Sequence, residues 1–191
     1  MKAFVFLGIV SSVLSLGAQE TQVIELGPDY RILQTIQQSL NDQGESISTT
    51  NRHTELGTGM HYWTGTEWRE SHPIFKLVPG AAIADEVQHR FTVAHNINQE
   101  GAIVMETPDG KVFRSTPLIL AFRNIETGES VAIGQIQDSQ GELIAPNQVL
   151  YPNAMEGVAC SLRYTVLNQG IEQELIIQEP LRIVGGNQGH I

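Results

Sequence analysis

The residues best suited to bind a ligand are three aromatic side chains near one short turn, Tyr62, Trp63 and Trp68. Aromatic rings stack well on the apolar C–H face of a sugar, so an exposed group of them predicts a glycan contact. Burial in a corner of the core is the favoured alternative, because only 6% of the residues are aromatic and the core needs most of them. Tyr62 and Trp63 point to opposite faces of a regular strand, so the three side chains cannot share one role.

Histidine is frequent enough to suggest a metal site. On a strand, two histidines at i and i+2 share a face and can hold one ion, but the chain contains no His-X-His pair. His89 and His95 are six positions apart, which corresponds to about 20 Å along one strand. We therefore expect scattered surface or capping roles, and no metal or cofactor, for the histidines at five positions, His53, His61, His72, His89 and His95.

Carboxylates raise the alternative of a polysaccharide hydrolase. Such an enzyme needs two carboxyl groups facing a sugar at about 5–10 Å, and the sequence pairs none of its acids across a cleft. Nucleophile-elbow, phosphate-loop, dinucleotide and calcium-loop motifs are absent as well. No catalytic residue is therefore assigned. The acids considered are Glu55, Glu67, Glu70, Glu106, Asp109, Glu172 and Glu174.

Short strands and tight turns must position these side chains. Hairpins are predicted over residues 57–70, 101–115 and 158–178, with further turns at residues 126–129 and 138–141. The strongest turn is Pro-Asp-Gly at residues 108–110, where each residue type suits its position. This spacing of turns without helical periodicity predicts an all-β fold, an antiparallel β-sandwich of about eight to ten strands.

One segment, residues 30–40, fits two structures. Its apolar residues lie on one face of a helix, but Ile32, Ile36 and Leu40 also lie on one side of a strand. A turn at residues 41–44 leads into the β-favouring residues 46–50. We therefore favour a β-hairpin.

Four stretches resemble a known kind of domain when they are taken together. They are TELGTGMHYW at residues 54–63, TPDGK at 107–111, NQVLYP at 147–152 and GIEQE at 170–174. In this order they resemble an uncharacterised β-rich domain near the N-termini of secreted bacterial proteins, many of which carry YD-repeat or laminin-G-like modules downstream. The resemblance covers about residues 30–180 and implies export and a sheet-rich fold, but no activity.

The N-terminus has the layout of a cleavable signal peptide. Lys2 precedes an apolar stretch at residues 3–16, and small residues end at Ala18. The stretch is shorter than the roughly 20 residues that a membrane span needs, so an uncleaved anchor is the lesser alternative. We expect cleavage near Ala18 and a secreted or periplasmic protein without a membrane span. Cys160 is the only cysteine, so no internal disulfide forms, and we expect a buried structural thiol.

Composition limits the remaining choices. The 191 residues carry a net charge of −10, which repels phosphate backbones and argues against nucleic acid as a partner. We expect a signal peptide at residues 1–18, one β-rich domain at 19–184 and a flexible tail at 185–191. The function hypothesis is an exported, non-catalytic module that binds a glycan or assembles at the cell surface. Its partners would be carbohydrate or another cell-surface protein, and a self-associating structural protein is a further alternative.

Overall fold

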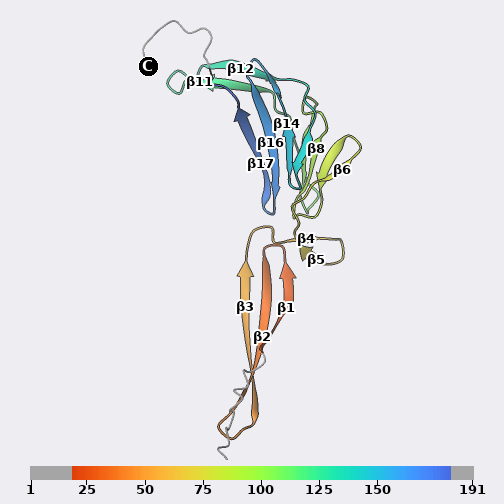
Figure 1. Ribbon diagram of the computed structural model, residues 1–191, viewed down its shortest axis with the longest axis vertical. Helices are drawn as coiled ribbons and strands as arrows, with labels where there is room; N and C mark the ends of the chain where they lie inside the picture. Colours follow the sequence, from red (N-terminus) through yellow and green to blue (C-terminus); the bar gives the residue numbers. More distant parts are fainter. Residues whose placement is uncertain (1–18, 182–191) are drawn as a thin grey trace, which may run out of the picture. The chain divides into compact units, whose positions relative to one another are not determined.

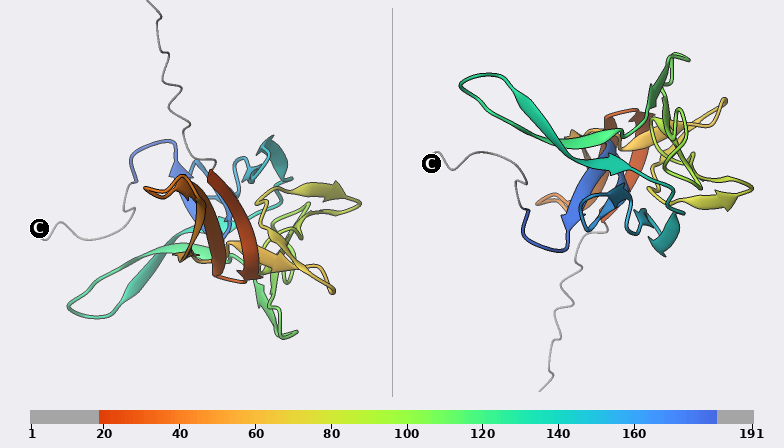
Figure 2. Two further views of the ribbon diagram at one scale, coloured as in Figure 1. Left: turned by 90° about the horizontal axis from the view of Figure 1, so that it is seen from below. Right: turned by 90° about the horizontal axis from the view of Figure 1, so that it is seen from above.

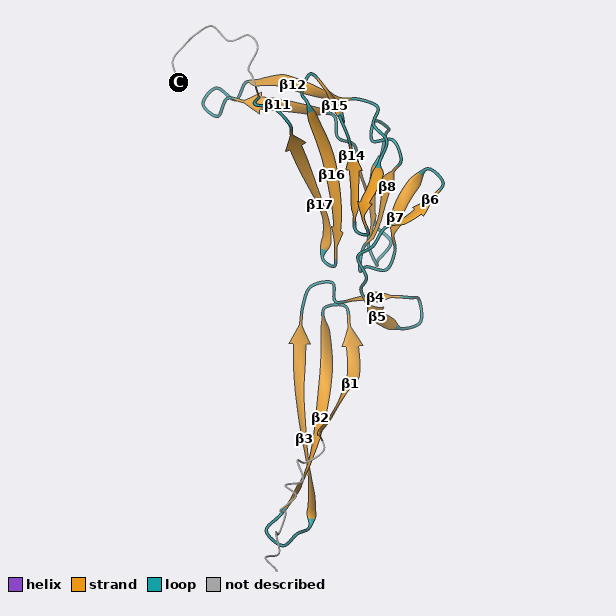
Figure 3. Cartoon of the chain, in the orientation of Figure 1, coloured by secondary structure: helices purple, strands orange, loops and turns teal. Residues whose placement is uncertain are grey.

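The computed structural model describes residues 19–181, and this part of the chain is all-β without a helix (Figure 3). Every described strand pairing with a printed register is antiparallel, which confirms the predicted class and is consistent with a β-sandwich. The predicted signal peptide and C-terminal tail lie outside the described residues.

The described chain divides into two compact units. The first contains residues 19–25 and 31–55, and the second contains residues 26–30 and 56–181. A single domain over residues 19–184 stays a prediction.

The first unit is built on a three-stranded sheet in the order β1-β2-β3, with β1 at Gln19–Gly27, β2 at Tyr30–Leu40 and β3 at Ser46–Leu56. The ambiguous segment is therefore a strand, as favoured. The turn after β2 forms because the Asn41 carboxamide oxygen accepts hydrogen bonds from the backbone amides of Gln43 and Glu45, and because Gly44 adopts a φ of 79°. No residue of this unit is buried in the described structure.

The second unit contains two larger sheets that face each other (Figure 1). The first has the order β10-β9-β8-β7-β6, with bounds Val112–Ser115, Ile103–Glu106, Arg90–Ala94, Ala81–Ala84 and Lys76–Val78. The second has the order β13-β14-β16-β17, with bounds Glu142–Ala145, Gln148–Tyr151, Cys160–Leu167 and Gly170–Ile177.

The core lies between these two sheets. Phe91 and Val93 of β8 are buried, as are Tyr151 of β14 and Leu162 and Tyr164 of β16. The rings of Tyr151 and Tyr164 meet edge to face at 6.0 Å between centroids. Alternation of apolar residues along β8 and β14 therefore supplies the inner faces of a sandwich, as the sequence predicts.

Two smaller sheets complete the second unit. One has the order β11-β12-β15, with bounds Ile119–Arg123, Ser130–Ile136 and Met155–Glu156. Its β11–β12 hairpin projects away from the rest of the unit (Figure 2). The other is a hairpin of β4 at His61–Trp63 and β5 at Trp68–Glu70.

The described residues form more strands, β1 to β17, than the eight to ten expected. The additional strands are short, with two to four residues each. The hairpins expected around residues 57–70, 101–115 and 158–178 are all present. Cys160 is free and fully buried, as expected, and burial raises the pKa of its thiol.

Candidate functional site

The β4–β5 hairpin contains the three aromatic residues that the sequence points to. Its register pairs Tyr62 with Arg69 and Trp63 with Trp68 directly across the two strands. The connecting turn is closed by Thr64, whose hydroxyl donates to the Glu67 carbonyl at 3.0 Å and accepts the Glu67 amide at 3.1 Å. Trp63 and Trp68 therefore flank the turn on the same face.

The two tryptophan rings contact each other, and one of them remains open to solvent. Their centroids are 5.2 Å apart and their planes are tilted by 60°, an arrangement that favours the edge of one ring against the face of the other. Trp63 is exposed, with 50% of its surface open to solvent, whereas Trp68 is less exposed and is only partly accessible. Burial in a core corner, the alternative favoured from the sequence, is therefore wrong for Trp63, because β4 and β5 form a separate two-stranded sheet outside the sandwich core.

Tyr62 lies on the opposite face of β4 and is half-buried. The polar groups around the turn are charged and exposed: Arg69 forms an ion pair with Glu67 at 2.6 Å. The Glu67 carboxylate holds the pKa of the Arg69 guanidinium above its ordinary value. The hairpin therefore carries an open aromatic ring on one face and the Arg69 side chain, which pairs with Tyr62, on the other.

Buried polar contacts fix the base of the hairpin within the second unit. The His61 side chain is buried, and its Nδ1 lies 2.7 Å from the Gly27 carbonyl oxygen, to which it donates. The Gly59 amide donates to Asp29 Oδ1 at 2.8 Å. The surface position expected for the histidines is wrong for His61, and no local pattern signals its buried contact because the carbonyl partner is 34 positions away in the chain.

The other candidate groups are not brought together. Within residues 19–181 no three His, Cys, Asp or Glu side chains are placed to hold a metal ion. Most of the candidate acids instead have a cationic partner. These ion pairs are Glu55–Arg31, Glu67–Arg69, Glu106–Arg90, Asp109–Lys111 and Glu174–Arg163.

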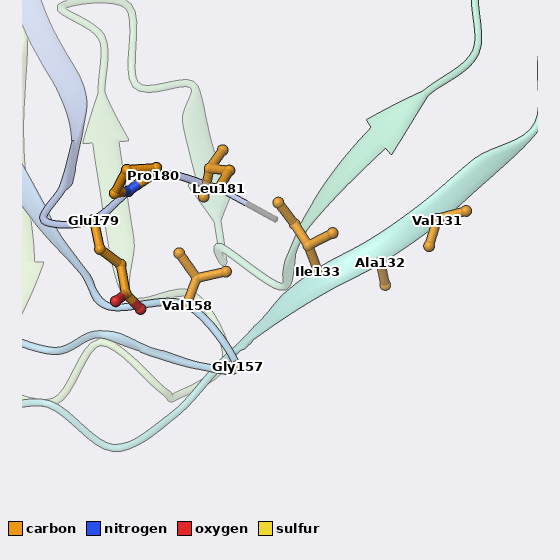
Figure 4. A pocket seen from close by; sticks show the side chains of 8 residues that line it. All are labelled: Val131, Ala132, Ile133, Gly157, Val158, Glu179, Pro180 and Leu181. Atoms are coloured by element: carbon orange, nitrogen blue, oxygen red, sulfur yellow. The ribbon is translucent and has the colours of Figure 1, made fainter. Parts of the chain in front are cut away.

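A cavity of about 450 Å³ lies elsewhere in the second unit, beside β12 (Figure 4). It was not predicted, because three segments far apart in the sequence form it and none carries a recognisable motif. None of the hairpin aromatics lines it. The lining residues are Val131, Ala132, Ile133, Gly157, Val158, Glu179, Pro180 and Leu181.

No protein-family model, curated protein or solved structure matches this chain. The resemblance to a domain of secreted bacterial proteins therefore stays a prediction. In the part of the chain that the structure describes, no helix is long and apolar enough to cross a membrane.

Proposed function

We propose that the protein is an exported, non-catalytic β-sandwich module that binds glycans through the β4–β5 hairpin. The observation that carries this proposal is the half-exposed ring of Trp63, which is held in place by Trp68 on the facing strand. Water hydrates the apolar face of an indole ring poorly, so replacing that water with the apolar face of a sugar ring is favourable. The N-terminal signal pattern supports export, and the ion-paired acids give no support to a hydrolase.

The proposed contact is limited to one sugar ring. Because the two indole planes are tilted by 60°, they do not form one flat surface for several sugar units. Tyr62 lies on the other face of β4 and would not touch the same ring. Arg69 pairs with Tyr62 across the two strands and therefore lies on that other face as well. Trp63 would stack on the sugar ring.

Tryptophan emission offers a direct test, since both tryptophans of the chain lie in this hairpin. The full chain is titrated with oligosaccharides of glucose, N-acetylglucosamine, xylose and mannose. We expect one class to change the emission, and Trp63→Ala to weaken binding at least about tenfold, or about 1.4 kcal/mol. Calorimetry measures the affinity of the variant, which has lost the reporting ring.

Phe113→Ala is the matched control, because Phe113 is also an exposed aromatic residue but lies on β10. It should bind as the unchanged protein does. Circular dichroism confirms that each variant is folded. If Trp63→Ala keeps full affinity, the hairpin is not the site. If no class of glycan binds, the proposed function is wrong.

A further inference from the structure

One edge of β12 is unpaired along the first part of the strand. On one side β12 pairs with β11 from Ser130 to Gln135, but on the other side it pairs with β15 only at Gln135 and Ile136. Among the described residues, no strand pairs with the second edge of residues 130–134. The Gly157 backbone lies against this edge at Ile133, since a Cβ at position 157 would be 2.9 Å from the Ile133 carbonyl oxygen, so the open part is residues 130–132. This stretch contains neither proline nor a charged side chain, two of the features by which proteins prevent strand addition. A third such feature, a β-bulge, is confined to Ile133, which has no partner on β11.

The 450 Å³ cavity adjoins this unpaired edge. Val131 and Ile133 project from β12 on the same side, and Pro180 and Leu181 lie across the opening from Ile133 (Figure 4). Val131 is 50% exposed. A strand added to this edge would form backbone hydrogen bonds with β12, and its alternate side chains would cover Val131 and Ile133.

Acidic residues lie at both ends of the unpaired edge. Glu129 immediately precedes β12, Glu156 pairs with Gln135 at the far end, and Glu179 lines the cavity. None of the three forms an ion pair with a cation of residues 19–181. An added strand can occupy only the part of this edge before β15, so cations at its two ends would face Glu129 at one end and Glu156 and Glu179 at the other.

We propose that the edge of β12 and the adjoining cavity bind an extended, cationic segment of a protein partner by β-strand addition. The favoured segment has a basic residue at each end and apolar side chains between them. A second copy of this chain fits less well, because antiparallel pairing of two such edges brings the same acids together. This surface is separate from the tryptophan hairpin, so the two proposals are tested independently.

The test uses a fluorescein-labelled peptide with the sequence KTVTVTK, whose anisotropy is followed as the full chain is added. We expect binding that weakens strongly as salt rises from about 50 to 500 mM, because the contact is electrostatic and exposed. The peptide ETVTVTE should bind at least tenfold more weakly. KTVTPTK should also bind weakly, because proline removes a backbone donor that strand addition needs.

Protein variants locate the contact. Glu156→Lys and Glu179→Lys should each weaken binding of KTVTVTK at least tenfold and strengthen binding of ETVTVTE. Glu172→Lys is the matched control, because Glu172 is exposed on β17 and does not line the cavity. It should leave the affinities for both peptides within twofold of the unchanged protein.

Three results would overturn the proposal. The first is equal binding of KTVTPTK and KTVTVTK, which would indicate charge attraction without strand addition. The second is binding that Glu179→Lys does not change. The third is a different occupant, shown either by dimerisation in sedimentation that Val131→Asp abolishes, or by displacement of KTVTVTK by a peptide of residues 182–191.

Discussion

Tyr151 and Tyr164 connect the parts of the sandwich through both their rings and their hydroxyl groups. The Tyr151 hydroxyl donates to the Ala94 carbonyl of the facing sheet, and the Tyr164 hydroxyl donates to Gln173 Oε1 at 2.9 Å. Both side chains are at least 98% buried, Tyr151 at 0% and Tyr164 at 2% exposed. Each phenol is therefore a buried polar group that must stay protonated and hydrogen-bonded to be tolerated.

We expect folding stability to fall at alkaline pH, partly because of Tyr164. Burial raises the pKa of Tyr164 to about 12, whereas an unfolded tyrosine titrates near about 10. The native state holds this proton more tightly, so the contribution is complete below about pH 10. It is lost as the pH rises from about 10 to about 12, at up to about 1.4 kcal/mol per pH unit. Urea unfolding between pH 7 and 11 measures the change.

Tyr164→Phe separates this effect from other alkaline titrations. The variant loses the titrating hydroxyl group but keeps the aromatic ring. Its stability should therefore decline less steeply above about pH 10 than that of the unchanged protein. Tyr151, whose pKa burial also raises, would account for part of the remaining slope. Equal slopes for the two proteins would contradict the prediction.

Gly59 illustrates a residue whose backbone leaves no room for a side chain. Its φ is 68°, and a Cβ atom would lie 2.0 Å from the Asn168 carbonyl oxygen. We expect Gly59→Ala to lower the free energy of unfolding by at least about 3 kcal/mol, through backbone strain and this clash. Chemical denaturation measures the loss.

Gly65→Ala is the control for backbone strain alone. Gly65 also has a positive φ, of 99°, but nothing lies within 4 Å of the position of its Cβ. We expect Gly65→Ala to cost about 1–2 kcal/mol. Similar losses for the two variants would show that the contact with Asn168 is not restrictive.

At the scale of elements, the three strands β1, β2 and β3 differ from the sandwich strands in burial. In the described structure no residue of the first unit is buried, whereas Cys160, Leu162 and Val166 of β16 are completely buried. Cross-strand polar contacts, such as the Arg52–Gln34 hydrogen bond of 2.8 Å, are exposed and add little stability. The first unit is therefore expected to open more easily than the second.

Hydrogen exchange tests this difference between elements. Amides of β2, the central strand of its sheet, should exchange at least about a hundredfold faster than those of β16, which is also paired on both sides. The comparison is matched because both strands have two hydrogen-bonded neighbours. Equal protection of β2 and β16 would mean that the first unit is stabilised by contacts beyond its own side chains.

The elements that could be predicted from the sequence are those whose stabilising contacts join residues close together in the chain. The turn around Asp109 is an example, because Lys111 and Thr107 contact its carboxylate and hold its pKa below its ordinary value. The exposure of Trp63 could not be predicted. Alternation places Tyr62 and Trp63 on opposite faces, but which face meets water depends on distant segments. The cavity beside β12 has the same origin, because β12 and Glu179 are far apart in the sequence.

At the scale of the whole molecule, the described residues contain one hydrophobic core, and it lies entirely in the second unit. A three-stranded sheet without a buried face is marginally stable in water. The chain is therefore not expected to unfold in a single cooperative transition.

We expect two transitions in urea. Far-UV circular dichroism reports both units, whereas tryptophan emission reports only the second, which contains Trp63 and Trp68. The circular dichroism signal should therefore begin to change at a lower urea concentration than the emission. Coincident curves would contradict the prediction and indicate that the two units unfold together.

The burial of Cys160 has a practical consequence for labelling chemistry. Maleimides react with accessible thiolates, and the only native thiol is both fully buried and shifted toward its protonated form. A cysteine introduced on the surface, for example Thr66→Cys in the hairpin turn or Glu172→Cys on β17, would be the single reactive thiol of the folded protein. Fluorophores or spin labels can then be attached at one chosen position without removing any native residue.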